Sequence, residues 1–233
     1  MPMQVQYFFM TSLPPLGSLD EPSPMALADL VGRAGDLPEI RAAIAAVLLE
    51  HDLLARQAVT TGERDSIEPV VLTAAQARGD EPLPEALQVE TGADSARRIG
   101  EDLLWEAYYR HVAAEGARLG CGFLSEWAAF EAALRNALVE ARAKALNLAA
   151  DDYKVAVELD RGAADTAAIV SAWSAADGPL EAQRALDQGR WDWLSRHGGW
   201  YSFELDEAAA YARGLVLIRR WQTLKASHAP TAP

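Results

Sequence analysis

The longest regular pattern of apolar positions lies between Pro84 and Pro179, a stretch without proline. Because proline interrupts helices, this stretch can hold two long ones, and we predict them over about residues 93–118 and 123–148. Glycine permits the left-handed turn that ends a helix, so Gly120-Cys121-Gly122 is the predicted break. The second helix has one apolar stripe at steps of three and four residues, which predicts a core-facing side: Phe123, Trp127, Phe130, Leu134, Ala137 and Ala141.

Helical spacing of apolar residues continues on both sides of this pair. It predicts further helices over about residues 37–57, 163–175, 179–195 and 204–225. Prolines and glycines break residues 62–92 into short helices joined by loops. Residues 4–13 are rich in aromatic side chains, which favour an extended segment. The sequence therefore predicts an all-α fold of packed helical bundles with a short extended N-terminal segment.

Composition agrees with this fold, since 46 of the 233 residues are alanine, the strongest helix former. We expect one helical domain over residues 1–229, formed of a single body or of two or three helical subdomains, and a disordered tail over 230–233. The single cysteine, Cys121, excludes an internal disulfide and a zinc site built from cysteines.

The net charge of −13 and the presence of only three lysines argue against a nucleic-acid backbone or a lipid surface as partner. No apolar run approaches the roughly 18–20 residues of a membrane span, and no export signal is evident, so we expect a cytoplasmic protein. The charge is uneven: residues 1–180 carry −14 and the last 53 residues carry +1. The basic residues of the final helix complement its dipole or meet a partner.

No known catalytic or metal-binding motif is present, and we expect neither catalysis nor a cofactor. The histidines have no metal-ligand spacing, and no phosphate-binding loop or nucleophile elbow occurs. Two pairs of carboxylates, Asp102 with Glu106 and Glu126 with Glu131, are the candidates if the chain is an enzyme after all.

Three polar side chains of the second long helix have predicted structural roles. Glu131 and Arg135 have the spacing of an ion pair on a helix surface. Asn136, unfavourable within a helix, is predicted to join helices by a buried hydrogen bond or to cap a neighbouring one.

All seven tryptophans follow residue 104. Trp191 and Trp193 flank one aspartate and point to divergent sides of a helix. One of them can be core, while the other must face a second packing surface, a partner or water.

Three stretches, in order along the chain, resemble a known family. They are Tyr7-Phe8-Phe9-Met10-Thr11-Ser12-Leu13-Pro14-Pro15-Leu16; Phe123-Leu124-Ser125-Glu126-Trp127-Ala128-Ala129-Phe130-Glu131-Ala132-Ala133-Leu134-Arg135-Asn136-Ala137-Leu138; and Trp191-Asp192-Trp193-Leu194 followed by Arg219-Arg220-Trp221-Gln222-Thr223-Leu224. Together they look like a little-characterised bacterial family encoded beside V/A-type ATPase subunits. That family resembles the C-type connector of these enzymes, the counterpart of the d-type connector of the vacuolar ATPase, although this chain is shorter than a usual C-type connector.

The resemblance implies a non-catalytic rotor connector, an all-helical socket that couples the central shaft to the membrane rotor ring during H⁺ or Na⁺ transport. Its implied partners are shaft and ring subunits, and it would be peripheral to the inner membrane without inserting into lipid. The implied fold-preserving residues are Phe123, Trp127, Phe130, Glu131, Arg135, Asn136 and Trp221. The interface candidates are Arg213, Arg219, Arg220, Trp191 and Trp193. The alternative is a free-standing helical adaptor or regulatory scaffold protein.

Overall fold

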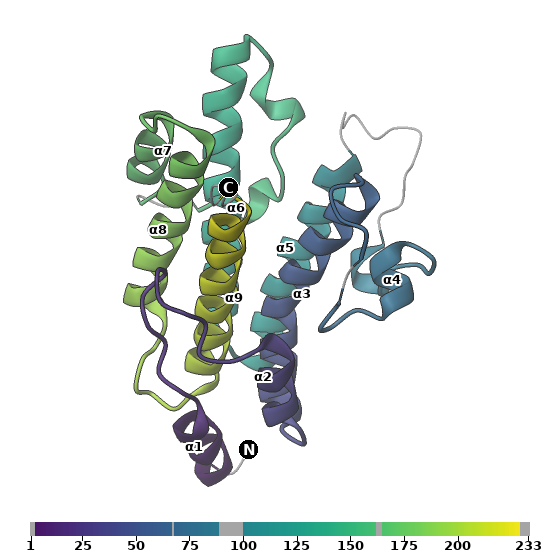
Figure 1. Cartoon of the computed structure of the whole chain (residues 1–233), viewed down its shortest axis with the longest axis vertical. Coiled ribbons are helices and arrows are strands. Elements are labelled where there is room, and N and C mark those ends of the chain that lie inside the picture. Colours follow the sequence, from purple (N-terminus) through teal and green to yellow (C-terminus); the bar gives the residue numbers. More distant parts are fainter. Residues whose placement is uncertain (1–2, 67, 89–99, 162–164, 229–233) are drawn as a thin grey trace, which may run out of the picture. The chain divides into compact units, whose positions relative to one another are not determined.

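The computed structural model describes residues 3–66, 68–88, 100–161 and 165–228, and every regular element in these ranges is a helix (Figure 1). The α-helices are α1 (Met3–Ser12), α2 (Leu27–Ala34), α3 (Pro38–Thr60), α4 (Ala74–Arg78), α5 (Gly100–Leu119), α6 (Gly122–Leu146), α7 (Thr166–Ser174), α8 (Pro179–His197) and α9 (Leu205–Ser227), and the 3₁₀ turns are η1 (Glu85–Leu87), η2 (Ala150–Asp152) and η3 (Val157–Leu159). The predicted all-α fold is confirmed.

The chain divides into two compact units. The terminal unit combines Met1–Leu48 with Ser171–Pro233, and the middle unit is Leu49–Val170. Helix α3 begins in the terminal unit and ends in the middle unit, whereas α7 begins in the middle unit and ends in the terminal unit. No helix in the described part of the chain is both long and apolar enough to cross a membrane.

The terminal unit is built around α9. Every residue from Glu207 to Ile218 is buried, which means that α9 is covered on all sides rather than along one stripe. Helices α8 and α9 lie side by side in Figure 1 and pack on one another, and α2 also contacts α9. Four alanines in the first turns of α9 are completely buried, and such small side chains allow neighbouring elements to approach closely: Ala208, Ala209, Ala210 and Ala212.

The middle unit is built around the helical hairpin of α5 and α6. The break falls where the sequence predicts it, because Gly120 has a φ of +67° that few other residues adopt. The first four members of the apolar stripe of α6 are buried, whereas Ala137 and Ala141 are half-buried. The ring centroids of Trp127 lie 6.1 Å from Phe123 and 5.5 Å from Phe130, so the stripe begins as an aromatic cluster.

Asn136 fastens α6 to the segment that follows it. Its side-chain amide donates to the Val155 carbonyl oxygen at 3.0 Å, and its Oδ1 accepts from the Val155 N–H at 2.9 Å. Asn136 is 2 % exposed and Val155 is not exposed at all. The predicted buried hydrogen bond is confirmed, but its partner is the backbone between η2 and η3 rather than another helix.

The extended segment predicted over residues 4–13 is wrong, because these residues form α1. Aromatic side chains favour strands only where a sheet is available to pair with. The last turn of α1 is closed locally: the Thr11 hydroxyl donates to the Tyr7 carbonyl oxygen at 2.9 Å, and the Ser12 hydroxyl donates to the Phe9 carbonyl oxygen at 2.7 Å.

The other predicted helices are found within a few residues of their expected bounds. The predicted starts near residues 93 and 163, and the tail over 230–233, lie outside the described residues. The sequence predicts an ion pair between Glu131 and Arg135 on the surface of the helix. The predicted surface position is wrong, because Glu131 is only 4 % exposed.

We expect Asn136→Ala to lower the free energy of unfolding by about 2–3 kcal/mol, because it leaves a buried N–H and a buried carbonyl oxygen of Val155 without this partner. Urea denaturation followed by circular dichroism measures the change. The matched control on the same helix is Lys144→Ala, which is exposed and is expected to alter stability by less than about 0.5 kcal/mol. Equal stability of the two variants would contradict the role of Asn136.

Candidate functional site

The terminal unit contains a cavity of about 410 Å³, within the usual size range of ligand-binding pockets. The segment after α1 forms one wall with Leu13, Pro14, Pro15, Leu16 and Gly17. The opposite wall comes from α8, α9 and the loop between them. Its lining is mainly apolar and aromatic, with one acidic side chain, Glu207.

Two of the resemblance motifs, far apart in sequence, meet at this cavity. The first motif contributes residues 10 and 13–16 to the cavity lining. The third motif contributes residues 191 and 194. The other half of the third motif, residues 219–224, lies further along α9. The middle motif, residues 123–138, belongs to α6 in the middle unit. The first and third motifs therefore share one surface of the terminal unit.

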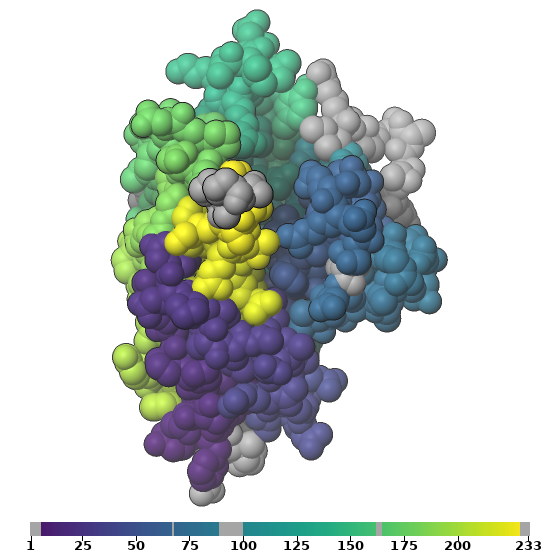
Figure 2. Space-filling model, viewed as in Figure 1, coloured from purple at the N-terminus to yellow at the C-terminus, as the bar shows by residue number. Residues whose placement is uncertain are grey.

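The segment between α1 and α2, residues 13–26, is called the strap below. Asp20 fixes it to α8 and α9: its carboxylate accepts from Trp221 Nε1 at 2.9 Å and forms ion pairs with Arg184 at 2.7 Å and Lys225 at 3.5 Å. The Arg184 guanidinium also lies 4.8 Å from the Trp221 ring centroid, a cation–π distance. Figure 2 shows the N-terminal segment, in purple, packed directly on the yellow end of α9.

The same contacts stabilise the charged form of Asp20. The hydrogen bond from Trp221 is the largest cause, and the charges of Arg184 and Lys225 act in the same direction, so the pKa of Asp20 lies below its ordinary value. The anchor is therefore a charge-assisted hydrogen bond at neutral pH.

The inner end of the strap rests on Tyr211 and Gly214 of α9. The Tyr211 hydroxyl donates to the Pro14 carbonyl oxygen at 2.8 Å, and burial raises the pKa of Tyr211 to about 12, which keeps it a donor at neutral pH. A Cβ added to Gly214 would lie 2.6 Å from Leu16 Cδ1, so any larger residue there would require the Leu16 side chain of the strap to shift.

The loop between α8 and α9 is strained where it borders the cavity. Tyr201 and Phe203 have φ values of +67° and +56°, which aromatic residues rarely adopt. Such conformations cost about 1–3 kcal/mol each and gather at functional sites. Two hydrogen bonds hold the loop in place, from Trp200 Nε1 to the Ser195 carbonyl oxygen at 3.2 Å and from Phe203 N–H to Glu207 Oε2 at 2.7 Å.

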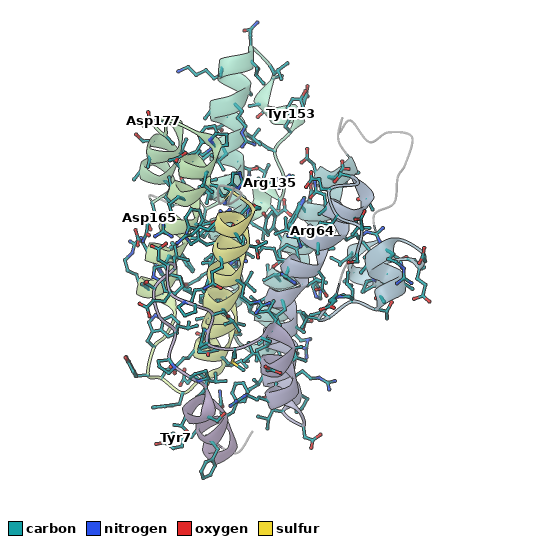
Figure 3. The ribbon with its side chains drawn as sticks, in the orientation of Figure 1. Tyr7, Arg64, Arg135, Tyr153, Asp165 and Asp177 are labelled. Atoms are coloured by element: carbon teal, nitrogen blue, oxygen red, sulfur yellow. The ribbon has the colours of Figure 1, made fainter. Side chains whose placement is uncertain are left out.

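Exposed aromatic side chains lie at the cavity and on the neighbouring helix α1. Tyr201 is 86 % exposed, and Phe8 and Tyr7 on α1 are 64 % and 48 % exposed. Tyr7, labelled in Figure 3, projects from α1, and its ring centroid lies 4.9 Å from that of Phe203, which lines the cavity. The three exposed residues, Tyr7, Phe8 and Tyr201, are called the aromatic rim below. Contiguous exposed apolar groups of this kind mark interaction surfaces.

The five predicted interface residues differ in position. The prediction that Arg213 is an interface residue is wrong, because this side chain of α9 is completely buried and cannot reach a partner. Trp193 is 5 % exposed and stacks on His197, with the ring centroids 4.2 Å apart. Trp191 is half-buried and lines the cavity, in agreement with the prediction that one indole is core and the other faces a second surface. Arg219 and Arg220 are half-buried.

The predicted fold-preserving residues are mostly buried. Six of them are each less than a tenth exposed: Phe123, Trp127, Phe130, Glu131, Asn136 and Trp221. Arg135, labelled in Figure 3, is half-buried and lies 5.7 Å from the Trp105 ring centroid.

The candidate carboxylates do not form one acidic site. Asp102 binds Arg135 at 2.7 Å, while Glu106 pairs with Arg110, which also binds Glu158. Glu126 is exposed, whereas Glu131 is buried in the same helix. In the ranges that the structure describes, no group of three or more histidine, cysteine, aspartate or glutamate side chains could hold a metal ion.

Sequence reasoning missed Glu207 and the strained loop. The Gly198-Gly199 pair marked a break, and the aromatic residues that follow it could have drawn attention to the loop. Glu207 resembles any acidic residue in the first turn of a helix, so only the three-dimensional arrangement shows that it borders a cavity.

Comparisons with known proteins found no matching family model, no matching curated protein and no matching solved structure.

We expect acidification to weaken the strap anchor only below the ordinary pKa of Asp20, 3.8. Because the folded-state pKa is lowered, the stabilisation is complete above 3.8 and is lost as the pH falls through the lower value. The indole N–H signal of Trp221 in two-dimensional NMR should shift with a midpoint below 3.8. This shift should disappear in Asp20→Asn and persist in Asp29→Asn, an exposed control on α2. A midpoint at or above 3.8 in the wild type would contradict the anchor.

We expect Tyr211→Phe to destabilise the protein by about 1 kcal/mol, because the Pro14 carbonyl oxygen loses its donor while the ring still fills its site. Chemical denaturation at neutral pH measures this, and limited proteolysis should show faster cleavage within the strap. The exposed rim variant Tyr201→Phe is the control, since it removes a hydroxyl without affecting the strap. Unchanged cleavage in Tyr211→Phe would show that the bond does not hold the strap.

Proposed function

We propose that this chain is a non-catalytic central rotor connector of a V/A-type ATPase. It would act as a socket, of the C-type or d-type, between the central shaft and the membrane rotor ring during H⁺ or Na⁺ transport. The observation that carries the proposal is the meeting of the first and third motifs at one apolar cavity with an aromatic rim. A motif that served core packing alone would not need to leave Tyr7 and Phe8 exposed.

The physical properties of the chain suit this role. Torque transfer needs a stiff body, and closely packed helices such as α9 and its neighbours provide one. It also needs durable interfaces, which bury roughly 2,000 Å² or more in permanent assemblies. The net charge of −13 favours a basic foot of the shaft through electrostatic complementarity. In this proposal the chain lies on the cytoplasmic face of the inner membrane and contacts ring loops rather than lipid.

The test is co-expression of a tagged chain with the shaft and ring subunits encoded in the same genome. We expect a stable complex that co-purifies through size-exclusion chromatography. Tyr201→Ala and Phe8→Ala should weaken shaft capture, since both remove exposed apolar rim area, whereas the exposed control Asp29→Asn should not. Failure of the wild-type chain to co-purify with either partner would refute the proposal.

A free-standing helical adaptor or regulatory scaffold is the second candidate, because the same cavity and rim would also suit another protein partner. Gene neighbourhood separates the two candidates, since a rotor connector should be encoded among ATPase subunits. A gene far from any such subunits, together with failed co-purification, would favour the adaptor.

A further inference from the structure

One carboxylate lies among the aromatic walls of the terminal-unit cavity. Glu207 is 8 % exposed, and the rings that line the same cavity belong to Trp191, Trp200, Tyr201, Phe203 and Tyr211. Among the described residues, the one hydrogen bond to this carboxylate comes from Phe203 N–H to Oε2. An ionised carboxylate offers about four acceptor positions, so Glu207 retains capacity to bind a donor inside the cavity.

In the part of the chain that the structure describes, Glu207 forms no ion pair with a lysine or arginine side chain. Arg33 acts electrostatically on the nearby Tyr211 hydroxyl, but its guanidinium donates to the Ser12 carbonyl oxygen at 2.8 Å. A nearly buried carboxylate without a cation beside it is costly, and a cation that enters the cavity would relieve that cost.

We propose that the cavity receives a lysine or arginine side chain of a protein partner. The apolar stem would lie along the aromatic rings, and the charged head would pair with Glu207. Aromatic faces attract cations through their quadrupole, by about 0.5–2 kcal/mol depending on desolvation. An apolar cavity alone would favour any hydrophobic group, but an apolar cavity with one carboxylate favours a group that is apolar along its length and positive at its end.

The aromatic rim identifies the source as a protein rather than a free amine. Tyr201 lines the cavity and is exposed, and the exposed Tyr7 contacts Phe203 of the lining and continues the aromatic surface to Phe8 on α1. A small amine inside the cavity would leave these rings in water, whereas a polypeptide that delivers a basic side chain would cover them with flanking apolar residues. This inference concerns the chemistry of the partner, and it stands whether or not the partner is a rotor shaft.

The test uses the full-length protein and two peptides that differ in one charge, Ac-Leu-Phe-Lys-Phe-Leu-NH₂ and the same peptide with norleucine in place of lysine. Isothermal titration calorimetry at neutral pH measures both affinities. We expect the lysine peptide to bind at least about tenfold more tightly than the norleucine peptide. Glu207→Gln should reduce this preference to about twofold or less, because glutamine keeps an oxygen for Phe203 N–H but loses the charge. Glu204→Gln, an exposed matched control at the start of the same helix, should retain the preference.

Three outcomes would overturn the proposal. They are equal binding of the two peptides to the wild type, absence of lysine-peptide binding up to millimolar concentration, and an unchanged preference in folded Glu207→Gln. If circular dichroism shows that this variant is unfolded, the proposal is tested by the affinities of the two peptides for the wild-type protein. The last ligand to be tested is n-butylammonium chloride, a free amine. If it binds as tightly as the lysine peptide, the cavity is a site for a free amine, and the proposal of a protein partner is refuted. Tyr201→Ala should weaken both peptides, because it removes rim area without removing charge.

Discussion

The terminal unit depends on the burial of α9 between Glu207 and Ile218. From Glu207 to Ile218 no residue of this helix faces water, so every side of it needs a neighbour. Helices α8 and α2 supply part of the cover, and the strap supplies another part through Leu16, which approaches Gly214, and through Pro14, which accepts from Tyr211. A strap without helical structure has no backbone ladder of its own to hold it. Its position therefore rests on side-chain anchors, of which the Asp20 contacts to Trp221 and Arg184 are the most polar.

The cavity lies where this cover is irregular. The strap, with two adjacent prolines, forms one wall, and α8, α9 and the loop between them form the other. The same loop carries the strained Tyr201 and Phe203. The structure tolerates that strain because two hydrogen bonds, to the Ser195 carbonyl oxygen and the Glu207 carboxylate, fix the loop from both sides. Strain, exposed aromatic rings and a carboxylate thus gather at one place.

Helical periodicity was sufficient to predict the long elements, because α6 buries the first four positions of its apolar stripe and the break before it at Gly120 needs a positive φ. It failed for α1, where local aromatic propensity was given more weight than the absence of any strand to pair with. It also misplaced Arg213: a basic residue on a helix usually meets water, but α9 has no exposed face at that position. The partner of Asn136 could not be predicted either, since the contact joins α6 to an irregular segment that has no periodic signal.

The candidate site was harder to predict than the fold for a physical reason. Its residues come from α1, the strap, α8, the following loop and α9, and no spacing rule relates positions 7 and 207. The resemblance motifs pointed to two of these segments, but they did not show that the segments face one cavity. Glu207 illustrates the difference most clearly: its bond to Phe203 N–H is ordinary helix-terminal chemistry, visible in principle from sequence. Its position beside the aromatic residues of α8, the following loop and α9 depends on the fold, and no local sequence pattern shows it.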